Sequence, residues 1–266
     1  THIHTYTTMA WSLSRVSKNP FPRLGHLALA DASGSTLYCF AGGKWHENDD
    51  SAALLPTAPQ HAGAIGISPV RVSKLSLTGL MTWLRPGLIG KKLPSLVAAA
   101  AACIGSKFYI FGGALAKPLS SSSSSSVAAA SSGTGMGAGW LSDKVYVLTY
   151  SHDTPTFSAP RFAGEKPEPR MMHSFTAVGD SIVLFGGVGS DGEVVGNSTF
   201  VFDGAKWAAT AACDSGPARR AHAAVGWSAM DVVVVFGGAD AAGKPLDDVM
   251  FYDVGADAWV APGVSG

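Results

Sequence analysis

The amino-acid sequence predicts an all-β protein made of similar four-stranded sheets packed against one another. The first observation is a fourfold repeat, because an apolar, β-rich run that ends in Gly-Gly occupies residues 36–43, 107–113, 181–187 and 231–238. The second is the surroundings of each run: an apolar strand precedes it, and an apolar-aromatic strand and a large aromatic residue follow it. Four strands in about 45–50 residues are typical of one β-propeller blade, and stacked blades bury faces that a single blade leaves exposed.

The first strand of three units opens with the same polar pair, Arg-x-x-His. The pairs are Arg23 and His26, Arg170 and His173, and Arg219 and His222. The second unit opens with an apolar segment instead, and its strand at 96–104 has neither residue. We expect this pair at the entry to the innermost strand of a blade.

The second strand of each unit ends at the double glycine. Glycine is favoured where the backbone is left-handed or crowded, because it has no side chain to clash. These structural glycines are Gly42, Gly43, Gly112, Gly113, Gly186, Gly187, Gly237 and Gly238.

Each unit closes on a strand with a large aromatic residue, which can fill the space between adjacent sheets. It is tryptophan in three units and Phe157 in the second. Residues 3–11 repeat only the closing strand and its tryptophan, which predicts a half blade before the four complete ones. The structural tryptophans are Trp11, Trp83, Trp207 and Trp259.

These features resemble kelch repeats, and the resemblance covers essentially the whole chain. The double glycines, the Pro-Arg-x-x-His openings at 22–26 and 169–173, and the spacing from Tyr252 to Trp259 carry it. It implies one kelch-type β-propeller region over residues 1–266. The expected division is a half blade at 1–19 and blades at 20–91, 92–166 (with a serine-rich insertion), 167–215 and 216–266.

Kelch-type rings usually contain more blades than this. Residues 260–266 after Trp259 are too few for the two strands that would complete the half blade. We therefore expect either part of a larger ring or an open crescent with an exposed edge, and such an edge invites pairing with another chain.

Charge and cysteine content exclude several classes of protein. The chain has 19 Lys+Arg and 19 Asp+Glu, a formal net charge of +0 and no long run of like charge, so we expect neither a nucleic-acid nor a membrane partner. Three widely spaced cysteines fit neither a disulfide framework nor a metal site. Lone thiols and the lack of a signal sequence favour the cytoplasm or nucleus, although the compartment stays open.

Two long gaps after Gly-Gly point to functional loops, because such loops are often functional or disordered. The first contains Trp45 and His46 among acidic residues, which predicts a contact site for a partner protein. The alternative is a solvated acidic turn whose tryptophan packs on its own blade. The second gap contains Ser120 to Ser126, a composition typical of a flexible insertion.

The arginines of the repeated openings are the other candidates for partner binding. The resemblance implies that Arg23, Arg170, Arg219 and Arg220 lie near the central channel, and guanidinium groups suit carboxylate or phosphate ligands. A structural role is the alternative, because a residue repeated in every blade is commonly part of the frame. The same alternative applies more strongly to His26, His173 and His222.

The primary prediction is a noncatalytic scaffold for protein–protein interaction that displays loops on one propeller face. We expect no catalytic residues, no metal and no cofactor, since phosphate-loop, zinc-protease and nucleophile-elbow motifs are missing from the sequence. The alternative is an enzyme or binding site for a carbohydrate or another small molecule at the channel mouth. That alternative requires arginine, histidine or glutamate groups to converge in one pocket.

Overall fold

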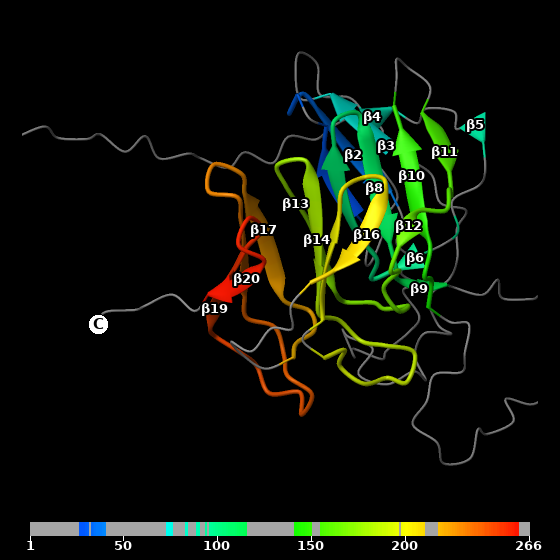
Figure 1. Cartoon of the computed structure of the whole chain (residues 1–266). Coiled ribbons are helices and arrows are strands. Elements are labelled where there is room, and N and C mark those ends of the chain that lie inside the picture. Colours follow the sequence, from blue (N-terminus) through cyan, green and yellow to red (C-terminus); the bar gives the residue numbers. More distant parts are fainter. Residues whose placement is uncertain are drawn as a thin grey trace, which may run out of the picture.

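The computed structural model contains strands and turns and, in the part it describes, no helix (Figure 1). The residues described are 27–31, 33–40, 73–76, 83–84, 89–90, 94, 96–115, 141–150, 155–196, 198–210 and 218–260. Within these ranges no helix is long or apolar enough to cross a bilayer. The predicted all-β fold of four blades is confirmed, while the half blade at 1–19 lies outside the described residues.

Each blade is an antiparallel meander whose strands run in chain order from the inner to the outer edge. Blade 1 contains β1 (Leu27–Ala30), β2 (Thr36–Phe40), β3 (Ser73–Ser76) and β4 (Trp83–Leu84). Blade 2 contains β7 (Ala100–Ile104), β8 (Lys107–Phe111), β10 (Val145–Thr149) and β11 (Thr156–Ser158). Blade 3 contains β13 (Ser174–Val178), β14 (Ser181–Phe185), β15 (Thr199–Phe202) and β16 (Lys206–Ala209). Blade 4 contains β17 (Ala223–Trp227), β18 (Val232–Phe236), β19 (Val249–Asp253) and β20 (Ala258–Val260).

Two connections between blades add a short fifth strand to the sheet that follows. β5 (Ile89–Gly90) pairs in parallel with β11, and β12 (Ala163–Gly164) pairs in parallel with β16. β6 (Leu96–Val97) and β9 (Ala114–Leu115) form a separate two-stranded sheet. The connection thus covers the outer edge of the next blade, where unpaired backbone groups would otherwise face solvent.

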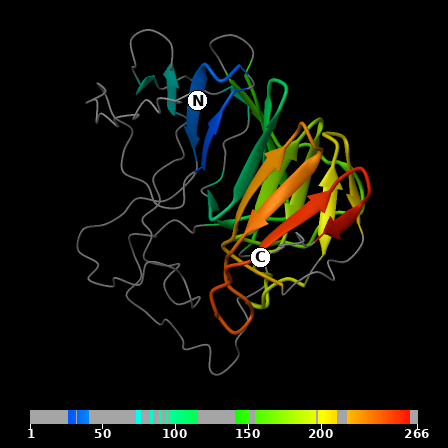
Figure 2. The same ribbon diagram turned by 90° about the vertical axis from the view of Figure 1, so that its left-hand side faces the viewer.

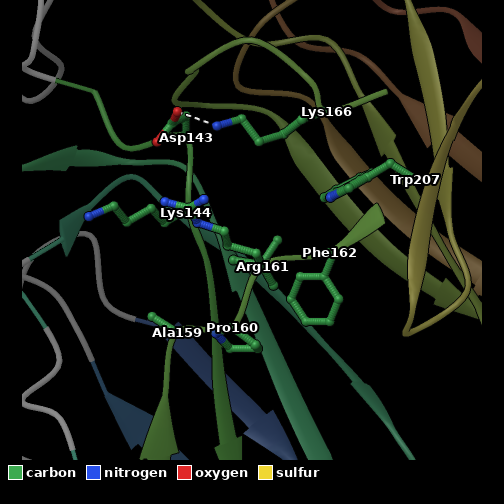
Figure 3. A pocket seen from close by; sticks show the side chains of 9 residues that line it. Asp143, Lys144, Ala159, Pro160, Arg161, Phe162, Lys166 and Trp207 are labelled. Atoms are coloured by element: carbon green, nitrogen blue, oxygen red, sulfur yellow. Dashed lines mark hydrogen bonds and ion pairs between the residues drawn. The ribbon is translucent and has the colours of Figure 1, made fainter. Parts of the chain in front are cut away.

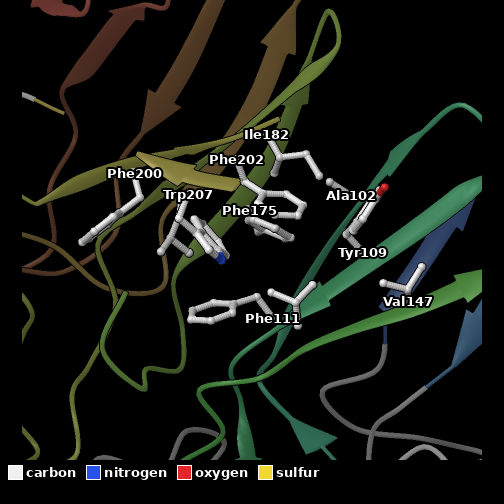
Figure 4. Close-up of a cluster of buried hydrophobic side chains, with 11 residues drawn as sticks. Ala102, Tyr109, Phe111, Val147, Phe175, Ile182, Phe200, Phe202 and Trp207 are labelled. Carbon is white, nitrogen blue, oxygen red and sulfur yellow. The ribbon is translucent and has the colours of Figure 1, made fainter. Parts of the chain in front are cut away.

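The core lies between neighbouring blades, whose inner strands contact one another in the order β1, β7, β13 and β17. Figure 4 shows the cluster between blades 2 and 3, where Trp207 packs at 5.3 Å between ring centroids from Phe111. The seam between blades 3 and 4 repeats this contact, with Trp259 at 4.4 Å from Phe185. In these two seams the closing tryptophan of one blade therefore covers the phenylalanine that precedes Gly-Gly in the blade before it.

Blade 4 has one covered face and one open face (Figure 2). The phenylalanine before Gly-Gly is 0% exposed in blade 2 (Phe111) and 1% exposed in blade 3 (Phe185), but Phe236 in blade 4 is 54% exposed. Val225 and Trp227 of β17 are also exposed. Their equivalents in the preceding blades are covered by the next sheet. This face of blade 4 therefore resembles the surfaces that form seams, but no sheet of the described structure covers it.

The two equivalent phenylalanines should differ in their contribution to stability. We expect Phe185→Ala to lower the free energy of unfolding by about 3–5 kcal/mol, because it leaves a cavity in a packed seam, and Phe236→Ala to lower it by less than about 1 kcal/mol. Urea denaturation of both variants measures the difference. Equal losses would mean that Phe236 is covered in solution.

Candidate functional site

The Arg-x-x-His openings and the double glycines meet on one face of the array. We call this the Gly-Gly face: it carries the loops that follow Gly-Gly and the segments that enter the inner strands. The Gly113 N–H donates to the carbonyl of Arg170 at 2.8 Å, and the Gly187 N–H donates to the carbonyl of Arg219 at 2.9 Å. The double glycine of one blade thus holds the opening segment of the next.

The two glycines of a pair have different neighbours. A Cβ on Gly186 would lie 2.5 Å from the Arg219 carbonyl oxygen and 2.8 Å from His222 Cε1, both in the next blade. A Cβ on Gly187 would lie 2.8 Å from the His173 Cβ in the same blade. Both glycines have positive φ, 65° and 103°. Neither position accepts a side chain, because the first makes room for the neighbouring blade and the second for its own inner strand.

A chain of backbone hydrogen bonds joins the inner edges of three blades. The equivalent residues Ala98, Met172 and Ala221 all have φ between 53° and 57°. The Met172 N–H donates to the Ala98 carbonyl at 3.1 Å, and the Ala221 N–H donates to the Met172 carbonyl at 2.9 Å. This strained, left-handed conformation costs energy in residues other than glycine, and the inter-blade bonds offset that cost.

Arg219 is 0% exposed, and its two terminal guanidinium nitrogens are hydrogen-bonded within blade 4, whereas its Nε has no partner among the described residues. It donates to both carboxylate oxygens of Asp248, at 2.6 and 2.7 Å, and to the Gly237 carbonyl at 3.0 Å. Hydrogen bonding from Arg219 lowers the pKa of Asp248 despite partial burial, which by itself would raise it. Such a bidentate pair ties the inner-strand entry to β19.

Arg170 is 1% exposed and has no carboxylate partner among the described residues. It donates to the carbonyls of Glu168 and Gly186, both at 3.2 Å, and its guanidinium carbon lies 5.6 Å from the Phe200 ring centroid. Strand register places Ser198 where blade 4 has Asp248. Desolvation lowers the pKa of Arg170 to about 10.

Blade 2 replaces both members of the pair. Leu96, fully buried, precedes the left-handed Ala98 by two residues, as Arg219 precedes Ala221. Lys144 precedes β10 at the position of Asp248. Exchange of the arginine alone would have left a carboxylate without its partner, so the two changes are chemically consistent.

The described histidines lie in the seams between blades. His173 meets Phe111 of blade 2 edge-on at 5.6 Å between ring centroids. His222 Nε2 is 2.9 Å from Ser174 Oγ of blade 3, and its ring lies 5.4 Å from that of Phe185. Desolvation lowers the pKa of His173 to about 3 and that of His222 to about 4. Both therefore act as neutral packing groups near pH 7.

The remaining predicted site residues are placed less fully. Arg220 is partly exposed and its backbone bridges to Ala239 on the Gly-Gly face. Arg23, Trp45, His46, His26, Gly42, Gly43 and Trp11 lie outside the described residues, as does the side chain of Trp83. Partner binding by the arginines, Trp45 and His46 stays a prediction. Within the described ranges, no group of three or more His, Cys, Asp or Glu side chains could hold a metal ion.

The turns that follow Gly-Gly share one frame, a feature that sequence reasoning missed. In blade 3 the Gly189 N–H donates to the Glu193 carbonyl and the Val195 N–H to the Gly187 carbonyl, at 2.9 and 2.8 Å. Blade 4 repeats both bonds 51 residues later, from Asp240 to Lys244 at 3.0 Å and from Leu246 to Gly238 at 2.9 Å. The matching glycines Gly192 and Gly243 were the signal in the sequence.

The described residues form two hollows beside this face. One, of about 610 Å³, lies on the outer rim between blades 2 and 3 and is lined by three cations, one carboxylate and two aromatic rings (Figure 3). We call it the rim groove. The other, of about 490 Å³, lies beside the blade 3 turn and is lined by Glu168, Asp191 and Glu193 together with small and apolar residues. Sequence reasoning found neither, because their residues come from separate segments.

Radially packed four-stranded meanders define the chain as a β-propeller. The chain belongs to the Kelch-repeat family, because the model of the KLHDC2/KLHL20/DRC7 Kelch-repeats domain matches residues 75–266. The solved structure of YjhT has the same fold, with a TM-score of 0.62 and 14% sequence identity over 92% of this chain and 70% of that one.

Two curated relatives match parts of the chain. A probable serine/threonine-protein kinase of Dictyostelium discoideum is 37% identical over 102 residues, which are 38% of this chain and 6% of that protein. The flagellar outer arm dynein alpha chain of Chlamydomonas reinhardtii is 33% identical over 119 residues, which are 41% of this chain and 3% of that protein. The matches therefore cover small parts of very long proteins.

The seam histidines predict a loss of stability in acid. An unfolded histidine titrates near 6.5, whereas the folded pKa values of His173 and His222 are lower. The unfolded chain thus binds more protons, and the free energy of unfolding should fall as pH drops from about 6.5 towards 4, by up to about 1.4 kcal/mol per pH unit for each histidine. Urea denaturation across this range should show a smaller slope for His222→Gln. An unchanged slope would contradict the assignment.

The buried pair of blade 4 gives a second stability test. Asp248→Asn leaves Arg219 buried without a counter-ion, so we expect the free energy of unfolding to fall by about 3 kcal/mol. The adjacent Asp247 is exposed, and Asp247→Asn should change it by no more than about 0.5 kcal/mol. Thermal or urea unfolding compares the two; similar small effects would show that the ion pair is not required.

Proposed function

We propose that this chain is a noncatalytic protein-interaction scaffold that uses a rigid propeller to present variable turns on its Gly-Gly face. Rigid display keeps the ordering cost of recognition low, because the loops are already held in place before the partner arrives. The family is consistent with such a role, and the partner itself is not identified by any relative.

The observation that carries the proposal is a constant frame with changing side chains. One backbone hydrogen bond closes the turn after Gly-Gly in three blades, from an N–H at the end of the turn to the carbonyl of the second glycine. The donors and acceptors are Ser142 and Gly113, Val195 and Gly187, and Leu246 and Gly238, at 2.8–2.9 Å. Within this frame blade 2 carries the insertion at 116–140, blade 3 the sequence Gly-Ser-Asp-Gly-Glu and blade 4 the sequence Asp-Ala-Ala-Gly-Lys. The backbone is conserved between blades, while size and charge differ.

The charge difference gives the face separate chemical regions. The blade 3 turn contributes Asp191 and Glu193 to the acidic hollow, whereas the blade 4 turn carries Asp240 and Lys244 and no net charge. Arg170 donates to the carbonyl of Gly186, which comes shortly before the blade 3 turn, and forms no ion pair with a described carboxylate. The burial of Arg170 favours a role in holding the blade together. Contact between its guanidinium and a carboxylate of the partner protein is part of the proposal.

The alternative is a carbohydrate or other small-molecule enzyme at the channel mouth. It would need inner-strand arginines and histidines to line a common pocket. The lining of neither hollow includes Arg170, Arg219, His173 or His222. No specific observation favours this alternative over display.

A turn exchange tests the display function. Replacing residues 189–193 with the blade 4 sequence, by Gly189→Asp, Ser190→Ala, Asp191→Ala and Glu193→Lys, transfers the Asp240 cap that accepts the Lys244 N–H at 2.8 Å. We expect stability within about 0.5 kcal/mol of wild type, because the frame is kept, but a several-fold loss of partners recovered by proximity labelling in cells.

The matched control is Asp180→Lys. Asp180 is exposed in the hairpin between β13 and β14, at the end of the blade away from the Gly-Gly face. This variant should retain the wild-type partners. An identical partner set for wild type and turn exchange, or equal losses in both variants, would contradict the proposal.

A further inference from the structure

The rim groove between blades 2 and 3 contains many hydrogen-bond donors and few acceptors. Lys144, Arg161 and Lys166 contribute three cationic groups, and Asp143 contributes the one carboxylate of the lining. That carboxylate pairs with Lys166, whose hydrogen bond lowers the pKa of Asp143 (Figure 3). Lys144 and Arg161 have no ion-pair partner in the described part of the chain. The groove therefore has an excess of positive charge.

A nearly buried donor points into the same groove. Trp207 is 3% exposed, and Figure 3 shows its indole nitrogen on the side of the groove. Among the described residues no acceptor is hydrogen-bonded to this N–H. The indole nitrogen is not among the buried atoms that lack a partner, so it is accessible from the groove. An accessible, unpaired indole N–H beside free cations indicates a place for an external acceptor.

The equivalent seam between blades 3 and 4 shows what is missing. There the indole N–H of Trp259 donates to Thr199 Oγ1 at 2.9 Å. Strand register places Val145 at the position of Thr199, since Thr199 is opposite Phe185 and Val145 is opposite Phe111. Valine cannot accept a hydrogen bond. One seam is thus satisfied internally, and the other leaves its tryptophan donor open.

We propose that the rim groove binds an acidic peptide segment, with a carboxylate that accepts from the Trp207 N–H and Arg161 and a second acidic group near Lys144. Phe162 and Pro160 supply an apolar wall for the intervening peptide. Charge-assisted hydrogen bonds from arginine to carboxylate provide both strength and orientation. This inference rests on the proposed function in one respect: the acidic segment would belong to a partner protein.

A titration with a defined probe tests the site on the whole chain. The probe is acetylated and amidated hexaglutamate, and hexaglutamine is the uncharged match. The ¹⁵N-labelled protein reports each indole N–H separately, and Trp207→Phe assigns the Trp207 signal. Phe157 already occupies the equivalent position in blade 2, so this substitution should be tolerated. We expect hexaglutamate to shift the Trp207 signal and hexaglutamine to leave it unchanged.

Three variants separate this site from general charge attraction. Arg161→Gln should raise the Kd by about tenfold. Lys206→Gln removes the same charge from an exposed residue of β16 that does not line the groove, and should change the Kd by no more than about twofold. Val145→Thr supplies the acceptor that blade 3 has, so it should shift the Trp207 signal without peptide and weaken hexaglutamate binding.

The contradicting outcomes are distinct. No shift with hexaglutamate, or equal weakening by Arg161→Gln and Lys206→Gln, would overturn the site. An equal response to inorganic phosphate at matched concentration, with no added affinity for the peptide, would define a small-anion site and overturn the peptide assignment. The peptide titration tests the rim groove, and the turn exchange tests display on the Gly-Gly face. Each proposal can therefore fail without the other.

Discussion

The fold depends on the close approach between the double glycines of blades 2 and 3 and the opening segment of the blade that follows each of them. The first glycine leaves room for the neighbour's arginine carbonyl and histidine ring, and the second leaves room for its own inner strand. Backbone hydrogen bonds then fix the distance between blades at the inner edge. The tryptophan contacts at the outer strands, Trp207 with Phe111 and Trp259 with Phe185, complete these two seams. These contacts between blades fix the positions of the turns on the Gly-Gly face.

The fold could be predicted from the sequence because its signals are local and repeated. Four glycine pairs and the closing tryptophans occur in phase, and the structure places those it describes in equivalent contacts. The different states of Arg170 and Arg219 could not be predicted in this way, because they depend on the residue just before the third strand of the same blade. That residue is Ser198 before β15 and Asp248 before β19. The rim groove was also hidden, since Lys144, Arg161 and Trp207 are joined only by the packing of two blades. Repetition predicts the frame, whereas single departures from it determine local chemistry.

Chemical variation is concentrated where the frame does not need a particular residue. Blade 2 has Leu96 and Lys144 in place of the arginine and aspartate of blade 4, and Val145 in place of Thr199 of blade 3. The seam remains closed by apolar packing around Phe111 and Trp207, so these exchanges leave the architecture intact. Their effect is on charge and hydrogen bonding at the rim, which makes blade 2 chemically different from its neighbours while retaining the same shape.

The open face of blade 4 also gives the array a direction. The seams between blades 2 and 3 and between blades 3 and 4 each join two unlike surfaces: the phenylalanine and glycine side of one sheet meets the histidine and tryptophan side of the next. Such a heterologous contact cannot be formed by two copies of the same surface, so two chains cannot close over Phe236 by twofold symmetry while using this geometry. Any sheet that continues the array there must arrive in the one orientation that its predecessors share.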